Sequence, residues 1–176
     1  MGARLLRIGK RPAAWETRDP EQILASDFTR RDGALDLELS VYELSSAEAV
    51  DLRGAALRIQ VEHAASFLRP PRKAAPLLDV TGVEVAIRAT PGTTAFAYSN
   101  EAHRELLLAD SHALRGLVDL VVAEIETRAI RFSLAEMLGY VRSHTDSDEW
   151  RAAASARETV GAWVHEAKKR PAGAKP

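Results

Sequence analysis

The spacing of the apolar residues changes along this chain, and the change limits the folds that it can adopt. Over residues 35–41 every second residue is apolar, namely Leu35, Leu37, Leu39 and Val41. A period of two is typical of a strand with one buried face. After residue 110, apolar residues recur every three or four positions, which indicates amphipathic helices. The sequence therefore predicts an α+β fold with a small, mostly antiparallel sheet and a helical C-terminal half.

Three regions are expected within one domain. Residues 1–110 should form the α+β part, and residues 111–168 should form helices that pack on it. The 46% of hydrophobic residues is sufficient for a sizeable core. Residues 169–176 combine basic side chains with Pro and Gly, and we expect them to form a disordered basic tail.

A hairpin is expected around Pro91 and Gly92. Apolar residues alternate with others over residues 83–87, as in a strand. Pro91 and Gly92 then occupy the two central positions of a four-residue turn, where a type II turn favours them. The second strand of the hairpin is expected to contain Phe96 and Tyr98.

Side chains that can cap a helix mark the expected helix starts. The first helix is expected to begin at Ser45 and to extend to about Phe67, although residues 56–62 also fit a strand by their alternation. Asp110 or Ser111 is expected to cap the next helix, after a strand at residues 104–108. Three pairs have the spacing of a capping box, namely Ser45–Glu48, Ser133–Glu136 and Asp146–Glu149.

The last helix is expected to run without interruption as far as Ala167. Its apolar face is spaced alternately by three and four residues and contains Trp150, Ala153, Arg157, Val160, Val164 and Ala167. Trp150 and Trp163 do not lie on one line along such a helix, so they cannot both be central to one narrow contact. Either both pack in the core, or Trp150, Arg157 and Trp163 present a surface to a partner.

Composition restricts the partners that the chain can have. With 24 basic and 25 acidic residues, the net charge of -1 produces no overall field that would attract nucleic acid or an anionic membrane. The absence of cysteine excludes disulfides, thiol catalysis and thiolate metal sites. No apolar segment approaches the roughly 20 residues of a membrane span, and residues 1–15 lack the apolar centre of a signal peptide. We expect a cytoplasmic protein without a membrane contact and without a cofactor.

Residues 133–150 resemble the start of a helix-turn-helix domain. Ala135 and Gly139 have the spacing that such domains use where the helices cross and turn. Thr145 and Asp148, however, take positions at which a recognition helix needs apolar residues, and nearby carboxylates would repel phosphates. Nucleic-acid binding by a degenerate helix-turn-helix is therefore not favoured. Basic residues that could contact phosphates lie in a loop and in the tail: Arg69, Arg72, Lys73, Lys168, Lys169 and Arg170.

Two pairs of residues could support chemistry. His103 with Glu105, and Asp110 with His112, are each two residues apart, so each pair would share a face of an extended chain. The sequence contains no nucleophile elbow, phosphate loop or helical zinc-protease motif. We therefore expect a non-enzymatic accessory or regulatory subunit that binds another protein or a second copy of itself, without a bound metal. The alternative is a metal-dependent or acid/base hydrolase or nuclease built on these four residues.

Overall fold

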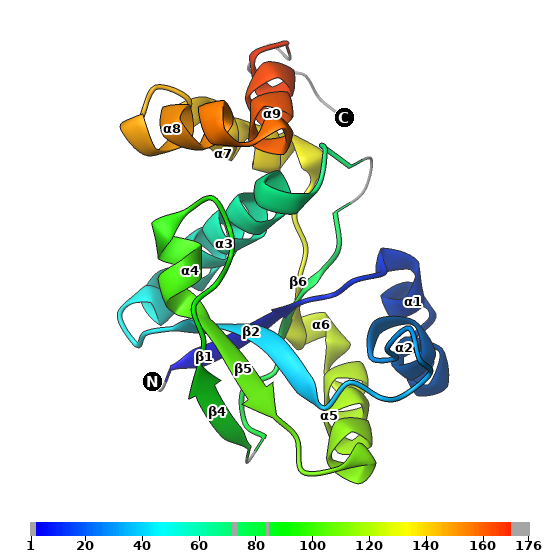
Figure 1. The fold of residues 1–176 in the computed structure, drawn as a ribbon. Coiled ribbons are helices and arrows are strands. Elements are labelled where there is room, and N and C mark those ends of the chain that lie inside the picture. Colours follow the sequence, from blue (N-terminus) through cyan, green and yellow to red (C-terminus); the bar gives the residue numbers. More distant parts are fainter. Residues whose placement is uncertain (1–2, 72–73, 84, 170–176) are drawn as a thin grey trace.

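The computed structural model describes residues 3–71, 74–83 and 85–169, and it confirms the predicted α+β fold (Figure 1). The described strands form one sheet in the order β4-β5-β2-β1-β3-β6, and each neighbouring pair is antiparallel. The strands are β1 (Arg4–Ile8), β2 (Glu38–Leu44), β3 (Leu77–Asp79), β4 (Ala86–Ala89), β5 (His103–Leu107) and β6 (Ala129–Ile130).

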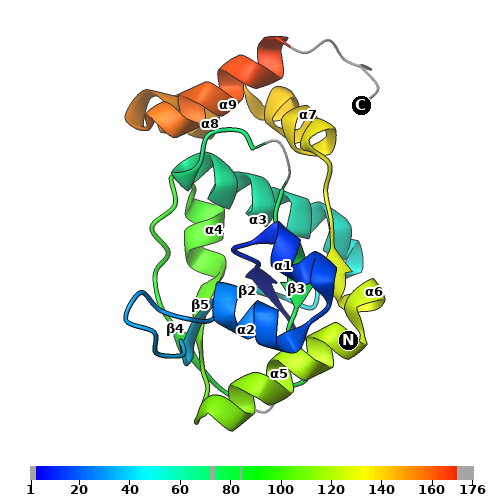
Figure 2. The ribbon, with the colours of Figure 1, turned by 90° about the vertical axis from the view of Figure 1, so that its right-hand side faces the viewer.

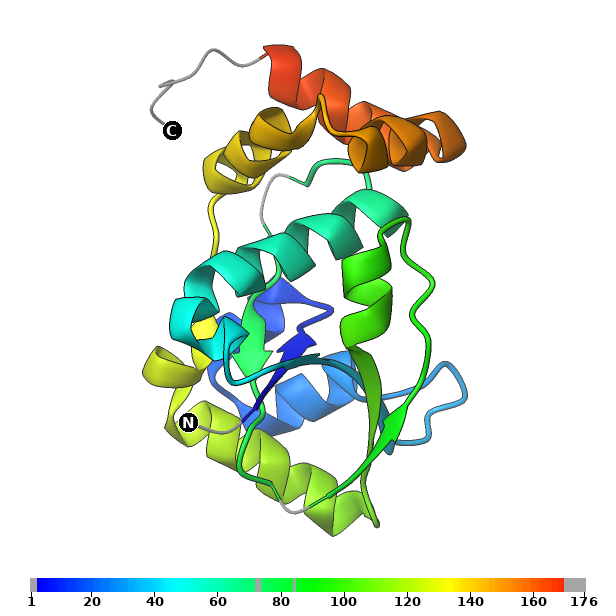
Figure 3. The ribbon, with the colours of Figure 1, turned by 90° about the vertical axis from the view of Figure 1, so that its left-hand side faces the viewer.

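Helices cover both faces of this sheet (Figures 1 and 2). One face packs against α1 (Pro12–Thr17), α2 (Pro20–Asp27), α5 (Ser111–Ala123) and α6 (Ile125–Arg128). The other packs against α3 (Leu52–Phe67), which follows the 3-10 helix η1 (Glu48–Asp51), and against α4 (Ala97–Ala102). On the far side of α3 lie α7 (Leu134–His144), α8 (Asp148–Ala156) and α9 (Glu158–Lys169), as Figure 3 shows. None of the helices in the described ranges is long and apolar enough to cross a membrane.

The strand predicted at residues 35–41 exists as β2, which begins at Glu38. The predicted alternation holds over residues 38–41, but from Tyr42 onward the strand is buried on its other face as well. Leu39 and Val41 join the apolar cluster on the face covered by α1, α2 and α5, whereas Tyr42 and Leu44 join the cluster on the α3 face. Because helices cover both faces, successive residues at the C-terminal end of β2 are buried on opposite sides.

Residues 56–62 are helical, as favoured from the sequence. Helix α3 begins after Asp51, whose side chain accepts a hydrogen bond from the Gly54 amide, and it ends at Phe67. The helix starts later than predicted, because the Ser45–Glu48 capping box forms but is followed by η1. Since α3 lies between the sheet and the C-terminal helices, it is buried on two sides. Burial on two sides explains why its apolar residues resemble a strand pattern as well as a helix.

The hairpin has a different second strand from the one predicted. β4 pairs with β5, with Ile87 opposite Leu106, and Phe96 and Tyr98 belong to the connection and not to a strand. Phe96 precedes α4 and Tyr98 lies inside that helix. The connection is held by Asn100, whose side chain accepts hydrogen bonds from the Thr94 amide and hydroxyl. The predicted strand at residues 104–108 corresponds to β5, and Asp110 caps α5 as expected.

The prediction of one continuous last helix is also wrong, because the chain forms α8 and α9 with a break at Arg157. The backbone of Arg157 is extended, with φ -135° and ψ 121°. The cap of α8 is Ser147, which accepts a hydrogen bond from the Trp150 amide in place of the predicted Asp146. Ser133 and Glu136 do form the capping box predicted for α7.

The helix-turn-helix resemblance ends at Gly139. That residue lies in the middle of α7, which continues to His144, so it forms neither a turn nor a helix C-cap. The actual turn between α7 and α8 contains Thr145 and Asp146. In addition, the Arg142 guanidinium donates hydrogen bonds to the Ala167 carbonyl of α9. The resemblance to a DNA-binding domain is therefore limited to residue spacing.

Candidate functional site

Strands β1 and β2 separate before either one ends. Their register stops at Leu6 opposite Tyr42, while β1 continues to Ile8 and pairs there with Leu77 of β3. Beyond this point, the Arg7 guanidinium donates a 3.3 Å hydrogen bond to the Ser40 carbonyl of β2. A side chain thus makes the contact between two strands that no longer pair there.

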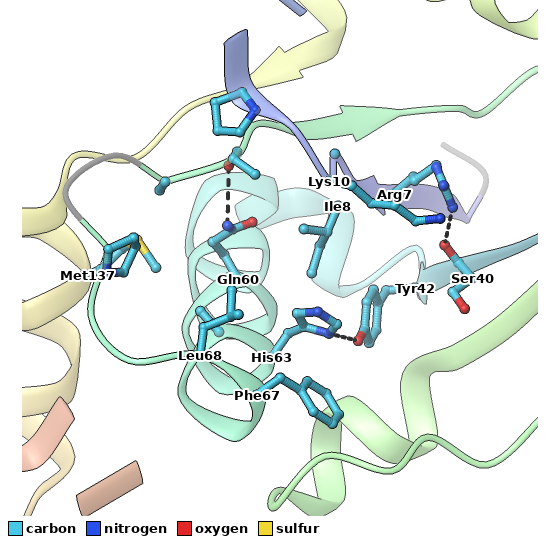
Figure 4. A pocket seen from close by; sticks show the side chains of 16 residues that line it. Arg7, Ile8, Lys10, Ser40, Tyr42, Gln60, His63, Phe67, Leu68 and Met137 are labelled. Carbon is cyan, nitrogen blue, oxygen red and sulfur yellow. Dashed lines mark hydrogen bonds between the residues drawn. The ribbon is translucent and has the colours of Figure 1, made fainter. Parts of the chain in front are cut away.

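A cavity of about 410 Å³ lies at this separation, between the sheet and α3. Its volume is in the range of small-molecule binding sites. Figure 4 shows Ile8 and Tyr42 from the strands facing His63 of α3, with Gln60 one turn away on the same helix, while the Arg7 guanidinium points toward Ser40. Most other lining residues are apolar, including Phe67, Leu68, Pro71 and Met137.

Arg7 is the buried cation of the cavity. Only 3% of its surface is exposed, and its guanidinium also lies 3.5 Å from the Asp27 carbonyl and 4.7 Å from the centre of the Phe28 ring. Burial lowers the pKa of Arg7, and the nearby Asp27 and Asp36 carboxylates oppose that effect only in part. The guanidinium nevertheless stays charged at neutral pH, because its ordinary pKa is so high. Its Nε atom is buried and has no hydrogen-bond partner.

Gln60, which lines the same cavity, has a second polar atom without a partner. Its Nε2 donates to the Ala75 carbonyl at 3.2 Å, while its buried Oε1 has no partner. Among the described residues, these two atoms are the buried side-chain polar atoms left without a hydrogen bond, and both belong to residues that line one cavity. Buried polar groups in folded proteins are nearly always paired, so an exception needs an explanation.

Tyr42 and His63 form the third polar feature of the cavity, with 2.7 Å between the Tyr42 hydroxyl and His63 Nδ1. Burial, and to a smaller extent the nearby His103, lower the pKa of His63 to about 4. Burial and the Glu62 carboxylate raise the pKa of Tyr42. The contact at neutral pH therefore joins a neutral imidazole to a protonated phenol.

The low pKa of His63 predicts a loss of stability in mild acid. In the unfolded chain, His63 takes up a proton as the pH falls through about 6.5, whereas the folded chain resists until about pH 4. Between these values the unfolded state binds more protons, so the free energy of unfolding should fall by up to about 3 kcal/mol through this residue. The raised pKa of Glu62 acts in the opposite direction.

Urea unfolding of the wild type and the His63→Gln variant at several pH values between 7 and 4 checks this expectation, because the difference between them isolates His63. The variant should lose less stability than the wild type, and the exposed His165→Gln should match the wild type. Equal pH dependence for the His63→Gln variant and the wild type would contradict the assignment.

The residues predicted for metal binding or catalysis do not form one site. His103 Nδ1 lies 2.9 Å from the Thr90 carbonyl, and Glu105 forms an ion pair with Arg88 on the neighbouring strand. Asp110 caps α5 by accepting from the Ala113 amide, and His112 is exposed in the first turn of that helix. Within the described part of the chain, no three His, Asp or Glu side chains form a group that could hold a metal ion.

The basic residues are likewise dispersed. Arg69 forms an ion pair with Glu158 of α9, and Lys168 and Lys169 are exposed in the last turn of that helix. Arg72, Lys73 and Arg170 lie outside the described residues, as does the predicted tail beyond Lys169.

The residues predicted for partner binding contact other residues of the same chain. Trp150 is 2% exposed and packs on Phe96, with 4.6 Å between the ring centres. Trp163 is fully buried and donates from Nε1 to the Leu68 carbonyl at 2.8 Å. Arg157 donates to the carbonyls of Ser66 and Thr93. Core packing, one of the two readings of these residues, is therefore the arrangement observed for both tryptophans.

Sequence reasoning missed Arg7, Gln60 and His63. The one available signal was Arg7, because it follows Leu5 and Leu6 and precedes Ile8 in a stretch that is otherwise apolar. A charge inside a buried strand requires partners, and that requirement marks it as unusual. Gln60 and His63 carry no comparable signal, since polar residues are ordinary in a helix.

Taken together, the fold and the cavity define a class: an α+β protein whose sheet is covered on both faces and opens between two strands at a small-molecule-sized site. Comparison of the chain with protein-family models, curated proteins and solved structures finds no match.

Proposed function

We propose that this chain is a cytoplasmic regulatory protein that binds a small, mainly apolar organic acid in the cavity and performs no chemistry on it. The observation that carries the proposal is Arg7, a buried cation that lines a cavity of ligand size and whose Nε has no hydrogen-bond partner. A ligand oxygen would supply the missing acceptor. Hydrogen bonds between charged groups are also the stronger ones in proteins.

The charges around the cavity favour a monoanion. Burial of Arg7 is only partly offset by Asp27 and Asp36, so a negative oxygen in the cavity would complete the compensation. Lys10 also lines the cavity, and its ammonium is 3.9 Å from Asp36 and largely exposed. Arg7 has a single unpartnered nitrogen, which suits one carboxylate oxygen better than a phosphate with several.

The protonation states support binding without catalysis. A general acid or base works best with a pKa near the working pH. The pKa of His63 is about 4 and that of Tyr42 is raised, so neither group exchanges a proton readily at pH 7.

The connection to the C-terminal helices supports regulation. Met137 of α7 and Leu68 after α3 both line the cavity, and the Leu68 carbonyl accepts the hydrogen bond of Trp163 in α9. A ligand that displaces Leu68 would therefore disturb the contact between α3 and α9. We propose that another protein, or a second copy of the chain, responds to this change at the surface of α7–α9.

Calorimetric titration tests the proposal with straight-chain and aryl carboxylic acids of about six to twelve carbons, a size suited to the cavity. Each acid is compared with its primary amide, which has the same shape without the charge. Acids should bind and amides should bind at least tenfold more weakly. The Arg7→Met variant should lose about 10- to 100-fold in affinity, as expected for a hydrogen bond to a charged group.

Two further variants serve as controls. Lys10→Met removes an exposed cation of the cavity with little risk to folding and should weaken binding several-fold, less at high salt. Arg31→Met removes an exposed charge that is not among the residues lining the cavity and should bind as the wild type does. If no acid binds, or if amides bind as tightly as acids, the proposed function is wrong.

A further inference from the structure

Gln60 specifies a second feature of the ligand, and this inference rests on the proposed function. Gln60 is 3% exposed and lines the cavity from α3. Its amide orientation follows from its partner: the Ala75 carbonyl can only accept, so the nitrogen of Gln60 must face it. The oxygen Oε1 is thereby left buried as a free acceptor. We infer that the ligand is a carboxylic acid that carries a hydrogen-bond donor, and that Gln60 accepts from it.

The donor must be separated from the carboxylate. In Figure 4, the Gln60 amide and the Arg7 guanidinium lie on opposite sides of Ile8. Ile8 and the other apolar lining residues would contact the middle of a ligand that spans this distance. The ligand is therefore elongated, with its acceptor at the Arg7 end, an apolar body, and its donor at the Gln60 end.

The chemistry around Gln60 restricts the donor to a neutral group. An ammonium buried against one amide oxygen would leave its other donors unpaired and its charge poorly solvated. A hydroxyl or an amide N–H has one proton to donate and matches a single acceptor. The ligand class is accordingly a chain-like monocarboxylic acid with a hydroxyl or a secondary amide near its far end.

Three series of straight-chain acids with matched lengths test this inference: one ending in a methyl group, one in a hydroxyl and one in a methyl ether. The ether has an acceptor oxygen but cannot donate, so it separates donation from polarity. For the best-fitting length, the wild type should bind the hydroxy acid about tenfold more tightly than the ether, as one additional hydrogen bond provides. Calorimetry measures the ratio, and this comparison requires no variant.

Variants then assign the preference to Gln60. Gln60→Met keeps the approximate shape and should bind the hydroxy acid and the ether equally. Gln22→Met, at an exposed position of α2, should keep the preference of the wild type. Arg7→Met should weaken all three series and keep their order. Acids that bind with no preference for the hydroxyl would overturn this inference and leave the proposed function standing, whereas failure of all acids to bind would overturn both.

Discussion

Replacing Trp163 with Ala is expected to lower the free energy of unfolding by about 3–5 kcal/mol, the range for removal of a large aromatic side chain from a core. Trp163 is fully buried in the cluster that joins α9 to α3 and α7. The truncation would leave a cavity and would also leave the Leu68 carbonyl without its 2.8 Å hydrogen bond. Urea unfolding followed by circular dichroism measures the change.

The Trp163→Phe variant keeps much of the packing and removes the hydrogen bond to Leu68. It keeps one aromatic ring and loses the indole N–H together with part of the ring volume, so we expect a loss of about 1–3 kcal/mol, smaller than for Ala. If Trp163 were instead an anchor for a partner, the Ala variant would unfold like the wild type and lose only binding. A destabilisation below about 1 kcal/mol for Trp163→Ala would therefore contradict the buried position.

The two tryptophans also show why the break between α8 and α9 could not be read from the sequence. The apolar residues Trp150, Ala153, Val160 and Ala167 are all buried, and their spacing of three, seven and seven continues a helical period across the break. Both helices face the same core, so the apolar period gives no sign of an interruption. Residues 150–160, which include the break at Arg157, contain neither Gly nor Pro. The extended backbone there is accompanied by contacts of its side chain with Ser66 and Thr93, which are distant in sequence.

Local signals located the helix caps to within one residue, since Ser147 caps α8 in place of the predicted Asp146. Ser133 with Glu136, and Asp110 before α5, cap helices as expected, because a cap depends on residues within one turn. The turn at Pro91 and Gly92 was a weaker guide. Phe96 and Tyr98 have the composition of a strand, but they lie in the connection that Asn100 and Thr94 stabilise. Tertiary packing thus outweighed β-propensity at these two positions.

The candidate site could not be predicted, because it depends on where two strands separate. Arg7 lies on a strand, and Gln60 and His63 lie on a helix more than 50 residues later. Residues so far apart in sequence form no recognisable motif. The pairs that sequence reasoning did select, His103 with Glu105 and Asp110 with His112, share a face only while the chain is extended. In the fold, Asp110 and His112 lie at the start of a helix, and this condition no longer holds.

Replacing Asp27 with Ala is the second change with a large expected effect, a loss of about 3–5 kcal/mol in the free energy of unfolding. Asp27 is fully buried, and its carboxylate accepts hydrogen bonds from the backbone amides of Lys10 and Arg11 and from the indole of Trp15. Truncation leaves the buried Trp15 indole and the two part-buried backbone amides without this partner. It also removes a negative charge that helps to compensate the buried Arg7.

Asp36 provides the matched control for charge alone. It is partly exposed and contributes to the same compensation of Arg7, but its ion pairs with Lys10 and Arg30 are long, at 3.9 and 3.7 Å. Asp36→Ala should therefore cost about 1 kcal/mol or less. Asp27→Asn should fall between the two, because one oxygen still accepts while the new amide group faces donors. Urea unfolding of the three variants gives this order if buried donors determine the cost, and equal losses for Asp27→Ala and Asp36→Ala would show instead that charge compensation of Arg7 dominates. The first result would make Asp27 the residue that holds β1, α1 and Arg7 in the geometry that the cavity requires.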